Sequence, residues 1–340
     1  MKTIRLGKTG LEVSRIGFGG IPIMRLAEDE AIKVVQRCLD LGVTFLDTAN
    51  GYGTSEERIG KAIAGRREQV IIATKTGARD RATAQKHLEL SLQRLDTDYI
   101  DLWQFHNVST FEAYDKVLGP NGAMEAAQEA LRAGKIRHIG ITSHSMDVAL
   151  KAVPSGHFET VQFPFNFVTN EAATELIPLA QEHDVGFISM KPMAGGLLDN
   201  AVLAIKYLLQ FDSIVPDPGI ERIEEIEEIV DIVQGPWELT SQEQREIERI
   251  RAEVGTRFCR RCGYCEPCPQ GVSIVTIMNL PSFRKRLPAE RFSTGWIAEA
   301  LESAENCIEC GECEEKCPYD LPIREMIVEN MELVKGLDHE

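Results

Sequence analysis

The sequence lacks long hydrophobic runs and has too few basic residues to balance its acidic ones. No stretch reaches the roughly 18 consecutive apolar residues of a membrane span, and MKTIRLGKTGLEVS at the N-terminus has no apolar run of signal-peptide length. We therefore expect a cytoplasmic location. The 37 Lys and Arg against 53 Asp and Glu give a net charge of −16, which repels nucleic-acid phosphates and anionic lipids. The charge therefore predicts that the protein binds neither nucleic acid nor a membrane surface.

A complete dinucleotide-binding glycine fingerprint is also missing. The nearest match, Gly17-Phe18-Gly19-Gly20, lacks the third glycine, and no helical pattern follows it at once. From Arg15 to Val233, short β-branched runs alternate eight times with amphipathic helical patterns. This alternation predicts an α/β fold, a closed (β/α)8 TIM barrel, with a doubly wound sheet as the alternative. The expected strands are 15–21, 45–49, 70–75, 100–106, 136–142, 160–166, 186–192 and 213–219.

The chain divides into three expected parts. Residues 1–235 form the barrel, preceded by a hairpin around Lys8-Thr9-Gly10 that is placed to plug the barrel floor. Residues 236–256 form a connecting helix, with Thr240 or Ser241 as its N-cap. The composition changes sharply at Cys259, so residues 257–340 are expected to form a small α-helical and loop domain of ferredoxin type.

The chain contains nine cysteines and no secretory signal, which disfavours disulfides and favours metal binding. One run, from Cys307 to Pro318, matches the ferredoxin spacing C-x2-C-x2-C-x3-C-P without departure. The other, from Cys259 to Pro269, is one residue shorter before its last cysteine. These runs predict two [4Fe–4S] clusters, with structural zinc or a single cluster as alternatives.

In two-cluster ferredoxins the last cysteine of each run serves the other cluster, which predicts crossed ligation here. Gly263 and Gly311 lie at equivalent places, where a small residue lets backbone N–H groups turn towards sulfur. The expected ligands are Cys259, Cys262, Cys265 and Cys317 for cluster 1, and Cys307, Cys310, Cys313 and Cys268 for cluster 2. The ninth cysteine, Cys38, is expected in the core of a helix face.

Catalytic residues of such barrels lie at the C-terminal ends of the strands. Three consecutive strands bring four polar residues to that rim: Asp47, Tyr52, Lys75 and His106. An ammonium near a phenol favours the phenolate and makes the hydroxyl a better acid, and a carboxylate can hold the ammonium in place. A histidine can orient a substrate oxygen. The set suits proton transfer to a carbonyl oxygen.

With these residues the sequence resembles the aldo/keto reductase family, in its branch with a C-terminal ferredoxin-like domain. The resemblance rests on RLGKTGLEVSRIGFGG, FLDTANGYGTSEERIG, IIATK, QFHN, LRAGKIRHIGITSH and both cysteine runs. It implies that Tyr52 is the general acid, that Asp47 and Lys75 tune it, and that His106 orients the substrate. It also implies a nicotinamide cofactor bound without a Rossmann fold.

By the same resemblance, the nicotinamide carboxamide is held by Ser143 and Gln162. The remaining cofactor positions are His144, Met190, Lys191, Pro192, Met193, Gly195, Gly219, Ile220, Arg222 and Glu225. The sequence departs from the family pattern at His144, Glu225 and Ile229, and Glu221 adds negative charge near the expected 2′-phosphate. NADPH is expected slightly ahead of NADH.

These features predict an iron–sulfur oxidoreductase that transfers hydride between a nicotinamide and a small carbonyl or alcohol. Hydride carries two electrons and a cluster carries one, so a flavin or an electron-transfer partner is expected to divide the pair. Two alternatives stay open. The chain could be an electron-transfer subunit with the barrel as a docking platform, or a reductase whose clusters only stabilise the fold.

Overall fold

The computed structural model describes residues 1–255 and 257–335, which form two compact units. Met1–Ala194 and Asn200–Leu239 make the first unit, and Gly195–Asp199 joins the second, which starts again at Thr240. Position 256 of the expected connecting helix and positions 336–340 of the expected ferredoxin-like domain lie outside the described residues. The short segment Gly195–Asp199, which the sequence pattern assigned to the barrel, packs with the second unit.

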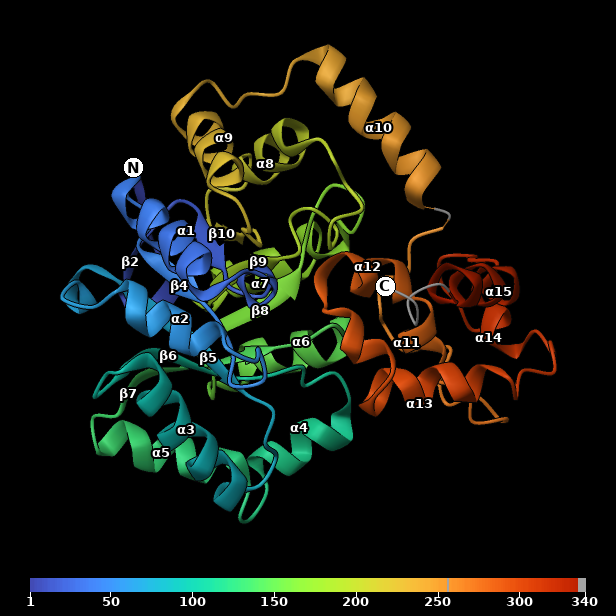
Figure 1. The fold of residues 1–340 in the computed structure, drawn as a ribbon, viewed down its shortest axis with the longest axis horizontal. Coiled ribbons are helices and arrows are strands. Elements are labelled where there is room, and N and C mark those ends of the chain that lie inside the picture. The colour runs from blue at the N-terminus through green and yellow to red at the C-terminus, as the bar shows by residue number, and fades with distance from the viewer. Residues whose placement is uncertain (256, 336–340) are drawn as a thin grey trace. The chain divides into compact units, whose positions relative to one another are not determined.

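The first unit is built on an eight-stranded parallel sheet whose order follows the chain (Figure 1). A parallel bridge between Gly19 and Gly219 joins the first and last strands, with the Gly19 N–H donating to Pro218 at 2.7 Å. The (β/α)8 barrel predicted from the alternating pattern is confirmed, and every expected strand is present. The strands are β3 (Gly17–Gly19), β4 (Phe45–Asp47), β5 (Ile71–Thr76), β6 (Ile100–Phe105), β7 (Ile136–Thr142), β8 (Thr160–Pro164), β9 (Gly186–Met190) and β10 (Ile214–Asp217).

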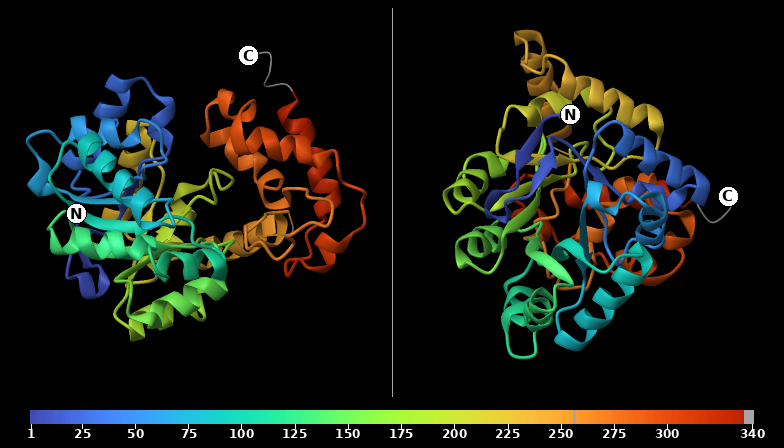
Figure 2. Two further views of the ribbon diagram at one scale, coloured as in Figure 1. Left: turned by 90° about the horizontal axis from the view of Figure 1, so that it is seen from below. Right: turned by 90° about the vertical axis from the view of Figure 1, so that its left-hand side faces the viewer.

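An antiparallel hairpin of β1 (Thr3–Arg5) and β2 (Glu12–Ser14) precedes the barrel, as the sequence predicted. Its Leu6 and Val13 are buried and pack in one cluster with residues of five barrel strands. The right-hand view of Figure 2 shows the dark blue hairpin lying across one end of the ring of strands. The hairpin closes this end of the barrel, so the opposite end, where the parallel strands finish, carries the functional groups.

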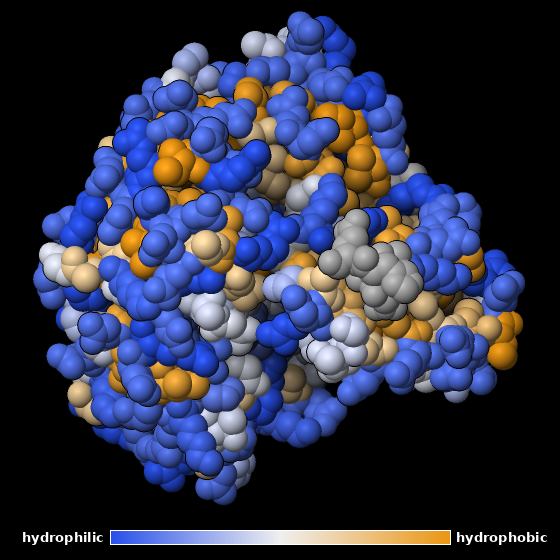
Figure 3. Space-filling model, in the orientation of Figure 1, coloured by the Kyte–Doolittle hydropathy of each residue, from blue (hydrophilic) through white to orange (hydrophobic). Residues whose placement is uncertain are grey.

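Amphipathic helices cover the outside of the barrel because each buries one apolar stripe against the strands. In α1, for example, Val34, Val35 and Cys38 are buried, which confirms Cys38 as a core residue. The helices are α1 (Glu28–Asp40), α2 (Ser55–Ala62), α3 (Arg81–Leu95), α4 (Phe111–Leu118), α5 (Ala123–Arg132), α6 (Met146–Ala152), α7 (Leu176–Glu182), α8 (Ala201–Leu209) and α9 (Ile223–Gln234). On the face drawn in Figure 3, hydrophilic residues cover most of these helices.

The part of the second unit that the structure describes consists of helices joined by loops, with no strand among the described residues. Its first helix begins with the predicted capping box, in which Thr240 Oγ1 accepts from the Glu243 N–H at 3.2 Å and Glu243 accepts from the Thr240 N–H at 2.8 Å. A separate apolar core, including Ile277, Leu280 and Ile327, holds the unit together. The helices are α10 (Ser241–Gly255), α11 (Ile274–Ile277), α12 (Leu280–Arg286), α13 (Gly295–Ala304), α14 (Glu312–Glu315) and α15 (Ile323–Val334). Among the described helices, none has the length and apolar character to span a bilayer.

Candidate functional site

Polar side chains form a layer inside the barrel directly above an apolar layer. The apolar layer contains Phe45, Ala73, Leu102, Ile188 and Val215, packed on the hairpin. Side chains two residues apart on a strand share a face, so the next inward positions follow two residues later. On four strands these positions are Asp47, Lys75, Gln104 and Asp217, and all four are buried.

Asp47 and Lys75 form a buried ion pair in this layer. The Lys75 Nζ donates to Asp47 Oδ2 and, at 2.8 Å, to the carbonyl of Thr48. Burial by itself lowers the pKa of Lys75, but the carboxylate of Asp47, helped by Tyr52 and Asp217, outweighs burial and raises it above the ordinary lysine value. Lys75 is therefore an ammonium at neutral pH.

Tyr52 and His106 lie at the rim above this pair. The Tyr52 hydroxyl is 3.5 Å from His106 Nε2, and the two rings meet edge to face with their centroids 5.5 Å apart. The Lys75 Nζ lies 5.1 Å from the centroid of the Tyr52 ring. The structure thus brings together all four residues that the strand ends predicted, with a phenol between an ammonium and an imidazole.

The sequence reasoning missed two members of the polar layer, Gln104 and Asp217. Gln104 Nε2 donates to Asp47 Oδ1 at 3.2 Å, and Gln162 Nε2 lies 3.3 Å from both Asp47 Oδ2 and Asp217 Oδ2. Both missed residues stand two positions after an inward apolar residue within a predicted strand. That period of two is a signal from which they could have been found.

The positions expected to hold the nicotinamide carboxamide lie on β8 and just after β7. Gln162 points into the barrel towards Asp47, and its buried Oε1 has no hydrogen-bond partner among the described residues. The Ser143 hydroxyl donates to the carbonyl of Ser145 at 3.1 Å. His144 Nδ1 lies 3.0 Å from Asn107 Oδ1. The buried Oε1 of Gln162 can therefore accept a hydrogen bond from an amide N–H.

The stretch after β9, expected to line the pyrophosphate, has an unusual backbone. Lys191 and Ala194 have positive φ values of 58° and 48°, which L-residues rarely adopt. The Lys191 carbonyl accepts from Asn166 Nδ2 at 3.0 Å. Met190 to Met193 belong to the first unit, whereas Gly195 belongs to the second, where its carbonyl accepts from Ser282 Oγ at 3.1 Å.

The positions expected near the adenosine phosphate surround the start of α9. Glu225 accepts from the Glu221 N–H at 2.9 Å and the Arg222 N–H at 3.2 Å, so it caps the helix. Arg222 is exposed and pairs with Glu225 at 3.0 Å, and Glu221 pairs with Arg25. Gly219 is exposed, while Ile220 is buried in the barrel core. The charge of Glu221 is thus compensated within the barrel.

The two cysteine runs have the same backbone pattern. Gly263 and Gly311 both have φ of +84°, and the residue two positions before each, Arg261 or Glu309, is also left-handed, with φ of 64° and 57°. A repeated pair of left-handed residues turns both loops in the same way. The shorter spacing at the end of the first run leaves this pattern unchanged.

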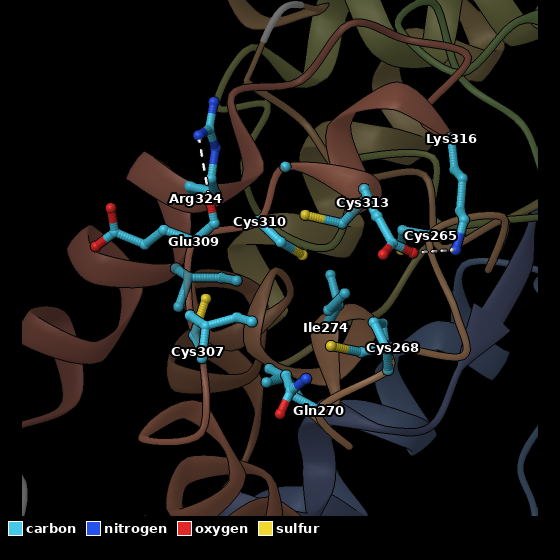
Figure 4. Close-up of a pocket in the computed structure, with 16 residues that line it drawn as sticks. Cys265, Cys268, Gln270, Ile274, Cys307, Glu309, Cys310, Cys313, Lys316 and Arg324 are labelled. Carbon is cyan, nitrogen blue, oxygen red and sulfur yellow. Dashed lines mark hydrogen bonds and ion pairs between the residues drawn. The ribbon is translucent and has the colours of Figure 1, made fainter.

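Two pockets in the second unit are ringed by these cysteines. One is lined by Cys265, Cys268, Cys307, Cys310 and Cys313. Figure 4 shows the sulfur atoms of Cys268, Cys307, Cys310 and Cys313 turned towards a shared space. The other is lined by Cys259, Cys262, Cys265 and Cys317. Each expected ligand set therefore lines one pocket.

Two thiols of the first cysteine run, Cys262 and Cys265, are hard to ionise unless a cation lies beside them. Burial, and then the neighbouring Cys259, raise the pKa of Cys265 to about 12. Burial also raises the pKa of Cys262, with a contribution from Cys317 across the pocket. A thiolate in such a place needs a nearby cation. In the part of the chain that the structure describes, no three His, Cys, Asp or Glu side chains converge closely enough to hold a single metal ion.

Comparisons with known proteins match both units. Residues 15–203 match the model of the aldo/keto reductase family, and residues 258–322 match that of the 4Fe-4S dicluster domain. The aldo-keto reductase YhdN of Bacillus subtilis is 36% identical over 219 residues, covering 58% of this chain and 64% of its own length. L-galactose dehydrogenase of Arabidopsis thaliana is 34% identical over 212 residues, covering 57% of this chain and 66% of its own.

Among solved structures, the holo form of the aldo-keto reductase AKR11C1 from Bacillus halodurans superposes with a TM-score of 0.65 at 28% identity. The match covers 74% of this chain and 96% of the Bacillus halodurans chain. The curated relatives YhdN and L-galactose dehydrogenase are matched over about two thirds of their length. The resemblance read from the sequence motifs is confirmed for both parts of the chain.

Proposed function

Because the chain belongs to the aldo/keto reductase family, we propose that its barrel transfers hydride between NADPH or NADH and a small carbonyl or alcohol. The observation that carries this proposal is the buried Asp47–Lys75 pair set beneath the Tyr52 hydroxyl. A dehydrogenase of a sugar among the relatives agrees with a small polar substrate. The oxidoreductase would also carry two [4Fe–4S] clusters in its second unit.

In the reductive direction, Tyr52 delivers a proton to the substrate oxygen. The Lys75 ammonium favours the phenolate that remains, and Asp47 holds the ammonium in place through a bond shielded from water. His106, at 3.5 Å from the Tyr52 hydroxyl, orients the substrate oxygen. Gln162 and Ser143 would hold the carboxamide of a bound nicotinamide, which would supply the hydride.

For the second unit we propose the crossed ligation. Cys317 completes the set of Cys259, Cys262 and Cys265, and Cys268 completes the set of the second run. The support is that each set lines its own pocket and that the two loops share their left-handed residues. Clusters held by these cysteines would carry single electrons, so we also propose a redox partner that divides the hydride pair, with a flavin as a suitable carrier.

The test mixes the anaerobically purified protein with NADPH or NADH and a panel of aldehydes, ketones and sugars. Tyr52→Phe should lower kcat by roughly 10²- to 10⁴-fold and leave nucleotide affinity unchanged, because only the proton donor is removed. Tyr99→Phe is the matched control, since Tyr99 stands just before β6 at the opposite end of the barrel and contacts Glu68. Equal turnover in wild type and Tyr52→Phe would contradict the mechanism.

The second candidate is an electron-transfer subunit in which the barrel only docks a partner. A protein of this kind would turn over none of the compounds in the panel, yet a partner would still reduce its clusters. The buried ion pair favours the enzyme, because burying two charges is costly and a docking platform has no use for them.

A further inference from the structure

Asp217 is a buried acid that the proposed mechanism does not use. It is the last residue of β10, it is 6% exposed, and it faces the barrel interior in the polar layer. Its Oδ2 lies 3.3 Å from Gln162 Nε2, and its buried Oδ1 has no hydrogen-bond partner among the described residues. The same Gln162 nitrogen lies 3.3 Å from Asp47 Oδ2, so one amide group bridges the two carboxyls.

The charges of the layer do not balance unless one carboxyl is protonated. Lys75 is the one ammonium facing Asp47 and Asp217 within the described barrel, and it bonds directly to Asp47. The strands beside Asp217, β3 and β9, carry no titratable residue, and Tyr52 is the other titratable group that Lys75 faces. An uncompensated buried charge is costly, so the extra proton belongs on Asp217.

We propose that Asp217 is a positioning residue that sets the acidity of Tyr52 through the Asp47–Lys75 pair. In its protonated form it leaves the pair neutral, and Lys75 acts on Tyr52 at full strength. When Asp217 loses its proton, a second negative charge faces the ammonium, the phenolate of Tyr52 is disfavoured, and Tyr52 becomes a weaker acid. The inference rests on the proposed function in that it gives Tyr52 the proton-donor role.

The electrostatics of the site agree with this assignment. Burial first, and then the carboxyl of Asp47, raise the pKa of Asp217 well above the usual aspartate value, although Lys75 acts in the opposite direction. The proton is therefore held at pH values where an exposed aspartate has lost it. The residue behaves as a second titrating group behind the Tyr52 hydroxyl.

The test titrates Tyr52 itself and requires no substrate. Tyrosinate absorbance is followed against pH in the full-length protein, and the Tyr52 signal is isolated by subtracting Tyr52→Phe, in both the wild-type and the Asp217→Asn background. The midpoint should fall by roughly one pH unit in Asp217→Asn, because the amide never acquires the negative charge. Asp101→Asn is the matched control: Asp101 is also 6% exposed but pairs with Arg67, outside the polar layer.

An unchanged Tyr52 midpoint in folded Asp217→Asn would overturn the proposal. If that variant does not fold, infrared spectroscopy of the wild-type protein tests the proposal. The C=O band of a protonated carboxyl should be present at neutral pH and disappear as the pH rises. No such band at neutral pH would also overturn it. A shifted midpoint combined with no turnover on the carbonyl panel would reject the hydride-transfer function and leave the role of Asp217 standing.

Discussion

Gly263 and Gly311 share a φ of +84°, and each directly follows the second cysteine of its run. An alanine in the left-handed region costs about 1 kcal/mol or more, because its Cβ crowds the following carbonyl. We expect Gly263→Ala and Gly311→Ala each to speed the loss of iron and sulfide on exposure to oxygen. Gly255→Ala, at the end of α10, is the control, since Gly255 is not left-handed. Equal rates in all three variants would contradict a shared loop geometry.

Crossed ligation makes a prediction that pairs of substitutions can test. Cys317→Ala combined with Cys262→Ala removes two ligands from one proposed cluster, so one cube should survive. Cys317→Ala combined with Cys310→Ala damages both clusters, and none should survive. Iron and sulfide analysis with electron paramagnetic resonance of the reduced protein distinguishes the two. Cys38→Ala is the control with full cluster content, because Cys38 is buried in the barrel core. The opposite pattern would mean that each run serves its own cluster.

The buried pair of Asp47 and Lys75 should be worth more as a pair than either residue alone. Asp47→Asn leaves the Lys75 ammonium, 2% exposed, without its counter-ion, and we expect a loss of about 3–5 kcal/mol in the free energy of unfolding. The double variant Asp47→Asn with Lys75→Met removes the buried charge and should recover part of that loss. Urea unfolding of the wild type, Asp47→Asn, Lys75→Met and the double variant gives the double-mutant cycle, and strictly additive losses would argue against the pair.

Much of the site could be predicted because it follows periodic rules. The strand ends predicted Asp47 and Lys75 as site residues, because the parallel strands of a barrel all end at one rim. The cysteine spacing predicted both cluster-binding loops, because three thiolates that surround one cube come from positions close together in the sequence. These features depend on local sequence, so they can be predicted without knowledge of tertiary contacts.

The remaining features depend on contacts between distant segments. Glu225, expected beside the cofactor, also caps α9 through its carboxylate, a local contact that the family motifs do not show. Gly195 was expected in the barrel, but its carbonyl bonds Ser282, which is distant along the chain. The sequence predicts only that Asp217 lies in a strand. Its place in the polar layer depends on β4 and β8, which bring Asp47 and Gln162 close to it.

The raised pKa of Asp217 also predicts how stability changes with pH. A carboxyl whose pKa is higher in the folded than in the unfolded state binds more protons when folded, so its contribution is fully present below the unfolded pKa, about 4. That contribution falls as the pH rises through the folded pKa. Asp217→Asn carries no such proton.

We therefore expect the difference in Tm between Asp217→Asn and wild type to move in favour of the variant as the pH is raised from about 4 to 8. Thermal unfolding of the barrel, followed by near-ultraviolet circular dichroism at several pH values, measures this difference. Asp101→Asn should show no comparable trend, because Arg67 pairs with the carboxylate of Asp101 in the folded barrel. A difference that stays constant over this range would mean that Asp217 is ionised throughout.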